Sequence, residues 1–123
     1  MNSQNVNRSI LHLQDIAHAR SGDKGNHANI GVIAWTNAGF EFLDGFLTAE
    51  LVADFLKPLN PNRVERFCMP GIRAYNFLLH NVLAGGASRS LRTDSQGKTL
   101  ASVLLQMKVP TPDEWEQMLK PSQ

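Results

Sequence analysis

The densest group of chemically reactive side chains lies in one segment near the N-terminus, residues 18–29. It supplies a hydroxyl, a carboxylate, two cations, two imidazoles and two amides, from Ser21, Asp23, Arg20, Lys24, His18, His27, Asn26 and Asn29. In such a segment Asp23 or His27 could transfer a proton, while Lys24 or Arg20 holds an anionic substrate. Gly22 and Gly25 tolerate backbone angles that other residues resist, so backbone N–H groups could also point at a ligand.

Several other interpretations of this segment compete with an acid–base site. A polar surface loop would use its Asp and Asn side chains only to bond its own backbone. The glycine spacing fits neither a P-loop nor a dinucleotide-binding fingerprint. His18, Asp23 and His27 are suitable metal ligands, but Lys24 would oppose a dication, so we predict no metal. The GxxG pattern at 22–25 is used by KH modules to clamp nucleic acid, but here it follows a strand instead of joining two helices.

The elements on either side must position this segment. Residues 10–20 indicate one bent strand or two short ones, because Ile16 breaks an alternating pattern. Residues 21–29 are expected to be a loop, since they are polar and punctuated by glycine. Residues 30–35 are apolar at both odd and even positions, which is typical of a central strand covered on both faces. Residues 39–45 are expected to be irregular and to form a hairpin with this strand.

The second half of the chain predicts two further helices and two further strand regions. Thr48 caps a helix that ends near Leu56. Residues 64–69 form a strand, and Pro70 then opens a helix that runs to about residue 83. Residues 91–109 predict a hairpin with its turn at 94–97. A capping box at 111–114 begins a short helix that ends near residue 119.

These elements predict an α/β (α+β) two-layer sandwich. The order β-β-α-β-α-β-β places two helices on one face of a mixed sheet, in a ferredoxin-like arrangement. The domain is expected to span residues 10–109. A flexible N-terminus, residues 1–9, precedes it, and a tail with a short helix, residues 110–123, follows it.

Composition narrows the classes of partner and the compartment. A net charge of +1 and a pI near 8.0 lack the basic character of nucleic-acid binders. The apolar runs are too short to span a membrane, and residues 1–9 lack the apolar core of a signal peptide. Cys68 is the only cysteine, so no disulfide can form within the chain. We therefore expect a cytoplasmic protein that binds neither nucleic acid nor membrane.

Three stretches of the sequence resemble a known family. IAHARSGDKGNHANIGVIA, residues 16–34, looks like the opening motif of the small ferredoxin-fold domain of the acyclic terpene utilisation (AtuA) family. PGIRAYNFLL, residues 70–79, resembles that family's helix motif, and LAGGASRSLRTDSQGK, residues 83–98, its glycine-rich approach to a final hairpin. The resemblance covers about residues 11–109. It departs from the family at Asn26, where an acid is commoner, and at Gly71, where a polar residue is expected.

The resemblance implies both a partner and a reaction class. The chain looks like the stand-alone form of the domain, which implies a large AtuA-like α/β subunit that completes the site. The implied substrate is a branched or isoprenoid acyl-CoA or a related carboxylic acid, in hydratase- or lyase-type chemistry, with no cofactor other than CoA as part of the substrate. The implied catalytic residues are Ser21, Asp23, Lys24 and His27. The implied substrate-binding residues are Arg20, Gly22, Gly25, Asn29, Asn76 and Arg89.

Residues outside the motif allow a second hypothesis. The chain could be a non-catalytic module that binds a ligand or forms a homo-oligomer, since its low charge and the Trp115 region suit association. Asn76 within an apolar stretch either bonds the 21–29 segment or has a plain structural role. Cys68 is expected to be a small hydrophobe rather than a nucleophile. His80 is expected to lie at the surface or in an interface.

Overall fold

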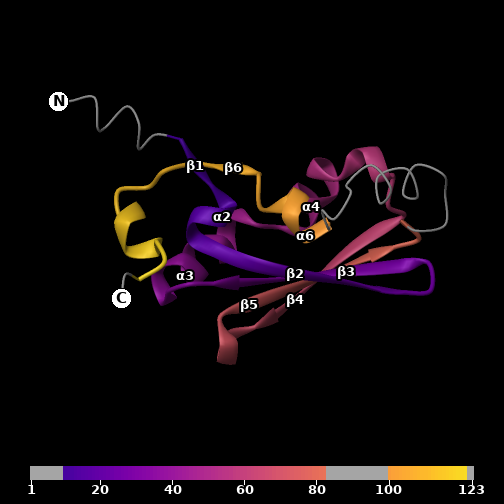
Figure 1. Ribbon diagram of the computed structural model, residues 1–123, viewed down its shortest axis with the longest axis horizontal. Helices are drawn as coiled ribbons and strands as arrows, with labels where there is room; N and C mark the ends of the chain where they lie inside the picture. Colours follow the sequence, from indigo (N-terminus) through magenta and orange to yellow (C-terminus); the bar gives the residue numbers. More distant parts are fainter. Residues whose placement is uncertain (1–9, 83–99, 122–123) are drawn as a thin grey trace.

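The computed structural model describes residues 10–82 and 100–121 of the 123 residues. Its main feature is a four-stranded sheet with helices packed on one side (Figure 1). The strands lie in the order β2-β3-β5-β4, and each of the three neighbouring pairs is antiparallel. Their bounds are Ala17–Lys24 for β2, His27–Ala34 for β3, Arg63–Met69 for β4 and Ala74–His80 for β5.

Shorter elements surround this sheet. The strands β1, Leu11–His12, and β6, Lys108–Val109, form a separate two-stranded sheet. The α-helices are α2, Leu13–Ile16, α3, Asn37–Phe46, α4, Ala49–Phe55, and α6, Leu100–Leu104. Single 3₁₀ turns occupy Lys57–Leu59, Pro70–Ile72 and Trp115–Met118.

The connections explain why the sheet has this strand order. β3 and β4 both run antiparallel to β5, which lies between them, so they are parallel to each other. α3 and α4 link them as a split β-α-β unit, which is the central feature of a ferredoxin-like fold. The α+β two-layer sandwich is therefore confirmed. We predicted a mixed sheet, and in the described residues parallel strands are found only two places apart, β3 with β4 and β2 with β5, while neighbouring strands are antiparallel.

The reactive segment is part of a β-hairpin, so the prediction of a loop over residues 21–29 was wrong. β2 continues to Lys24 and β3 begins at His27, which leaves a turn of only Gly25 and Asn26. Gly25 has φ of 62°, and a glycine with positive φ at the first central position is typical of a type II′ hairpin turn. Two paired strands therefore hold the side chains of this segment in a fixed alternation.

Two predicted element types were also wrong. Residues 39–45 belong to α3 rather than a hairpin, because the Thr36 hydroxyl caps this helix by accepting the Gly39 N–H at 3.0 Å. Residues 74–80 are the strand β5 and not part of a helix over 71–83. Tyr75, Phe77 and Leu79 are all fully buried, which is the period-two pattern of a strand with one covered face.

Only some of the elements predicted near the two ends of the chain fall on residues that the structure describes. The turn at 94–97 and the N-terminus 1–9 lie outside the described residues. In the part of the predicted hairpin that the structure describes, residues 100–109, residues 100–104 form α6, and only the two residues of β6 are a strand. The terminal helix is a 3₁₀ turn, and the hydroxyl of Thr111 is buried with no hydrogen-bond partner in the described part of the chain, so it does not act as the predicted cap.

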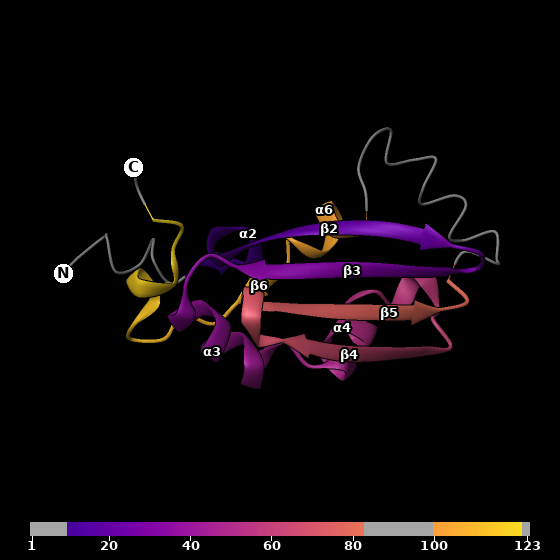
Figure 2. The same cartoon turned by 90° about the horizontal axis from the view of Figure 1, so that it is seen from below.

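The core uses only one face of the sheet. Buried side chains of β3 and β5, among them Ile30, Val32 and Phe77, pack against buried side chains of the helices, among them Leu43 and Leu104. Figure 2 shows the four strands side by side, with α4 and α6 behind them. We call the side of the main sheet away from these helices the open face, since no helix of the described residues covers it.

Tyr75 provides a direct test of this packing, because it is the only tyrosine in the chain. It is fully buried, and its hydroxyl donates to the Phe40 carbonyl at 2.7 Å. Burial, together with the negative charge of Asp44, raises its pKa to about 12. The neutral phenol is favoured by folding, so its contribution to stability is complete below pH about 10 and is lost as the pH rises towards 12.

An ultraviolet titration checks this prediction. We expect the phenolate of the folded protein to appear with a midpoint near pH 12, and that of the protein in concentrated urea near pH about 10. A midpoint near pH about 10 in the folded protein would contradict the burial of this ring.

Candidate functional site

The register of the hairpin divides the predicted site residues between the two faces of the sheet. Ser21 pairs with Ile30 and Asp23 with Ala28, and both partners are buried beneath the helices. Ser21 and Asp23 therefore lie on the helix side. The positions on the other parity lie on the open face: Arg20, Gly22, Lys24, His27 and Asn29, together with Asn76 of β5. The four predicted catalytic residues thus do not share one face.

Two amides form the polar centre of the open face. The side-chain amide of Asn29 donates to the side-chain oxygen of Asn76 at 3.0 Å, although the residues are 47 positions apart. Of the two roles considered for Asn76, the structure shows the bond with the 21–29 segment. The pair keeps an amide oxygen on Asn29 as an acceptor and the amide group of Asn76 as a donor, so it can bind a carbonyl, carboxyl or amide group.

Glycines provide the space for these amides. A Cβ atom on Gly22 would lie 3.2 Å from the Asn29 side-chain oxygen, which is tighter than ordinary contact. A Cβ on Gly31 would lie 3.9 Å from the Asn76 side-chain oxygen, which is ordinary contact. Arg20 is paired with Gly31 across the hairpin and so lies beside the same position. The site is therefore a shallow polar area with one guanidinium at its edge.

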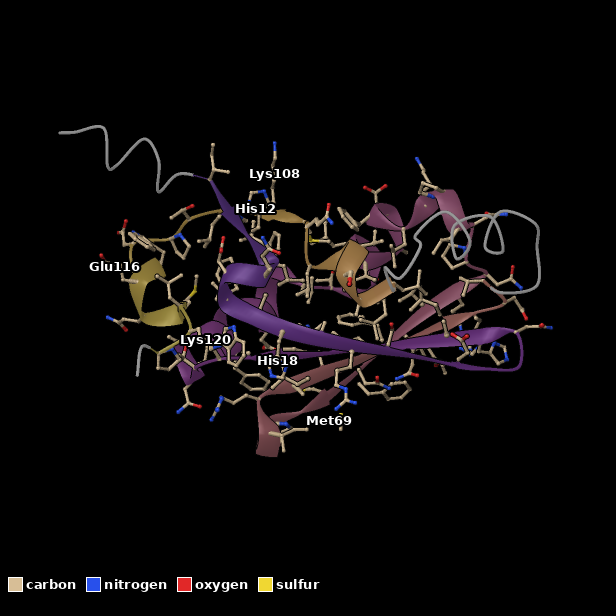
Figure 3. The ribbon with its side chains drawn as sticks, in the orientation of Figure 1. His12, His18, Met69, Lys108, Glu116 and Lys120 are labelled. Carbon is tan, nitrogen blue, oxygen red and sulfur yellow. The ribbon has the colours of Figure 1, made fainter. Side chains whose placement is uncertain are left out.

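Apolar and aromatic side chains surround this polar centre. Phe67 and Met69 of β4 are 48% and 43% exposed, and Ile72 in the following turn is 56% exposed. The His18 ring stacks on Trp35, with ring centroids 4.4 Å apart. His18 and Met69 lie on the same side of the sheet in Figure 3, away from His12 and Lys108. Exposed apolar side chains gathered on one face in this way often mark a surface that another molecule covers.

A second polar group lies at the hairpin end of the open face. His80 Nε2 lies 2.9 Å from a carboxylate oxygen of Glu65, and Arg63 lies 3.4 Å from the same oxygen. The hydrogen bond with His80 is the largest cause that lowers the pKa of Glu65. His27 meets His80 edge to face, with ring centroids 5.1 Å apart. The sequence placed His80 at the surface or in an interface and gave it no functional role, because a helix was expected there.

On the helix side, Ser21 links the hairpin to α6. The backbone N–H of Ala101 donates to the Ser21 hydroxyl at 3.3 Å. This bond gives Ser21 a positioning role at the start of the helix. Asp23 is exposed near the end of β2 and also has an interaction partner.

The helix side also contains an apolar pocket of about 480 Å³. Its lining comes from α3, α4, the segment before β6 and β6 itself: Phe46, Leu51, Asp54, Phe55, Gln106, Met107 and Lys108. None of the predicted site residues lines it. Among residues 10–82 and 100–121, no group of three or more His, Cys, Asp or Glu side chains could hold a metal ion.

Comparison with known proteins identifies the family. The model of the AtuA ferredoxin-like domain matches residues 11–110, from β1 to just beyond β6. The chain belongs to this family. Neither the curated proteins nor the solved structures yielded a match. No described helix of this AtuA ferredoxin-like domain is long and apolar enough to cross a membrane.

The remaining predicted site residues lie at several different places in the structure. Gly25 forms the hairpin turn, and Lys24 is paired with His27 at the end of β2. Arg89 lies outside the described residues. Cys68 is exposed on β4, so the expectation that it is a small buried hydrophobe was wrong. The part of the AtuA-type motif that meets in space is therefore the open face, with Asn29 and Asn76 at its centre and His27 towards its hairpin end.

Proposed function

We propose that this domain is the small subunit or an accessory domain of an AtuA-type assembly. Its large α/β partner would cover the open face, and the substrate would lie between the two. The observation that carries this proposal is the Asn29–Asn76 pair, held at 3.0 Å on a face whose rim includes exposed Phe67 and Met69. Polar groups that are fixed in this way, within an apolar surround, suit an interface that also holds a ligand.

The substrate class in this proposal is an acyl-CoA or a related carboxylic acid, branched or isoprenoid, with hydratase- or lyase-type chemistry. The amides of Asn29 and Asn76 would orient the acyl carbonyl, and the guanidinium of Arg20 would bind a carboxylate or phosphate. His27 would take part in the acid–base chemistry on the open face. Asp23 lies at the same end of the hairpin but on the helix side, so it would assist only indirectly. CoA enters only as part of the substrate.

A non-catalytic role is the second candidate function. In it the domain forms a homo-oligomer or binds a ligand without chemistry. The exposed apolar side chains of β4 and the following turn favour this candidate, because the same face could meet a second copy of the chain.

Co-purification of the tagged chain from its host, followed by mass spectrometry, tests the proposal. We expect a large α/β protein in near-stoichiometric amount. In acyl-CoA assays of the reconstituted pair, His27→Ala should lower kcat by about 100-fold, the lower end for an acid–base group. Asp23→Ala should lower kcat less, because Asp23 lies on the helix side. Asp54→Ala, an exposed carboxylate on α4, is the matched control and should leave kcat unchanged.

Two outcomes would contradict the proposal. Recovery of the chain only as a homo-oligomer would favour the non-catalytic role. Full activity of both Asp23→Ala and His27→Ala in the reconstituted pair would remove their catalytic assignment.

A further inference from the structure

The hairpin end of the open face brings together two histidines whose hydrogen-bonding roles are complementary. His27 comes from the first residue of β3 and His80 from the last residue of β5. Their rings meet at an interplanar angle of 72°, with centroids 5.1 Å apart. Each ring has one nitrogen held by a protein group, and those groups determine where the proton of the neutral ring resides.

The tautomer of His80 follows from its partner. Nε2 lies 2.9 Å from Glu65, and the lowered pKa of Glu65 means that this carboxylate is ionised at neutral pH. An ionised carboxylate can only accept a hydrogen bond, so this contact requires the hydrogen on Nε2. The Arg63 guanidinium lies 3.4 Å from the same nitrogen and can only donate, but the shorter contact with the charged Glu65 carboxylate favours Nε2–H. The neutral His80 ring then has its lone pair on Nδ1, which is the nitrogen that can accept a proton. This is the arrangement in which a carboxylate orients a histidine base.

His27 has the opposite role. Its Nδ1 lies 3.1 Å from the backbone N–H of Asn81. A backbone N–H can only donate, so Nδ1 is the acceptor and the neutral His27 ring carries its hydrogen on Nε2. His27 is therefore held as a hydrogen-bond donor. Asn81 directly follows β5, and its left-handed φ of 61° turns the chain away from the strand immediately after this N–H.

We propose that His80 and His27 form an acid–base pair for acyl esters and thioesters, with His80 as the general base and His27 as the donor to the acyl oxygen. Glu65 is a positioning residue that orients His80, and Arg63, 3.4 Å from Glu65, keeps that carboxylate charged. The proposal deepens the proposed function and rests on it only for the acyl class of the substrate. It differs from the sequence-based hypothesis, in which His27 itself was a candidate for proton transfer.

The chemistry of the pair can be written for hydrolysis of an ester. His80 Nδ1 accepts a proton from water, whose oxygen forms a bond to the acyl carbon. The electron pair of the carbonyl moves to its oxygen, which accepts a hydrogen bond from His27 Nε2–H. When the carbonyl re-forms, the bond to the leaving group breaks, and His80 returns its proton to the solvent or to the leaving oxygen. A thioester carbonyl would be polarised in the same way.

Hydrolysis of 4-nitrophenyl acetate by the purified chain tests the pair without a known substrate. We expect His80→Gln and His27→Gln each to lower the second-order rate constant about tenfold or more. Because the two act on one substrate, the double variant should lose little more than His80→Gln alone. Glu65→Gln leaves His80 in place but removes the carboxylate charge that orients its ring. This variant should lower the rate at neutral pH severalfold.

His12→Gln is the matched control, since it removes a histidine from β1 on the opposite side of the molecule (Figure 3). It should hydrolyse the ester at the wild-type rate. Equal rates for His80→Gln and the wild type, or equal losses for His80→Gln and His12→Gln, would overturn the pair. If a large partner is recovered but this hydrolysis is independent of His80, only the pair fails. If the pair is active and no partner is recovered, only the subunit assignment fails.

Discussion

Replacing Phe77 with alanine is expected to lower the free energy of unfolding by about 3–5 kcal/mol. Phe77 is fully buried on β5, an inner strand of the main sheet, opposite Ile30 of β3. Its removal leaves a cavity in the layer between the sheet and the helices, where no water compensates for the lost contacts. Small domains have only about 5–15 kcal/mol of stability in total, so much of it would be lost. Urea unfolding followed by circular dichroism measures the change.

Phe67→Ala is the matched control for this experiment. Phe67 lies on the neighbouring strand β4 but faces the open side and is 48% exposed. Its replacement should change the free energy of unfolding by no more than about 0.5 kcal/mol, as is usual for exposed positions. Equal losses for the two variants would mean that the sheet does not have one covered and one open face.

The helix that the sequence predicts over 71–83 shows why one pattern can mislead. Ile72, Tyr75, Leu79 and Val82 recur at the spacing of a helix face, but Tyr75, Phe77 and Leu79 also alternate as in a strand. Both periods fit a short apolar run. Pairing decides between them, since β5 has hydrogen-bonded neighbours on both sides, β3 and β4. These partners are distant in sequence, so local periodicity does not contain them.

The reactive segment was located correctly but described as the wrong element. Glycines and polar side chains in residues 21–29 indicated a loop, although Gly25-Asn26 is a sequence typical of a hairpin turn between alternating strands. In a hairpin, alternate residues of this segment face opposite sides of the sheet. That division separates Ser21 from Asn29, which no count of side-chain types within the segment could reveal.

The contents of the candidate site were predictable to different degrees. The contact between Asn76 and the 21–29 segment could be predicted, because a polar amide in an apolar run needs a partner. The Glu65–His80 contact could not, since it requires β4 and β5 to be paired with Glu65 opposite Leu78, two positions along the ladder from Arg63 opposite His80. The signal for it appears only once both segments are treated as one hairpin.

The second large effect is expected at the surface that the proposed partner covers. Phe67→Ala should weaken the complex with the large α/β subunit by about 30-fold in Kd, which corresponds to about 2 kcal/mol. Phe67 is an exposed aromatic ring on the open face, paired across the strands with Asn76 at the polar centre. In the complex this ring would become buried next to a fixed polar pair, and buried aromatic side chains near the centre of an interface often carry much of its binding energy. Surface plasmon resonance with the immobilised partner measures the change.

Ile10→Ala separates this effect from a general loss of apolar surface. Ile10 is 59% exposed but lies before β1, away from the open face, so its replacement should leave Kd unchanged. Because Phe67→Ala is expected to leave folding intact, a weaker complex would report the interface itself. A Kd equal to that of the wild type would place the partner elsewhere. If the variant instead shifts a homo-oligomer of the chain to monomers, the same face joins two copies, and the non-catalytic assembly is the better account of the domain.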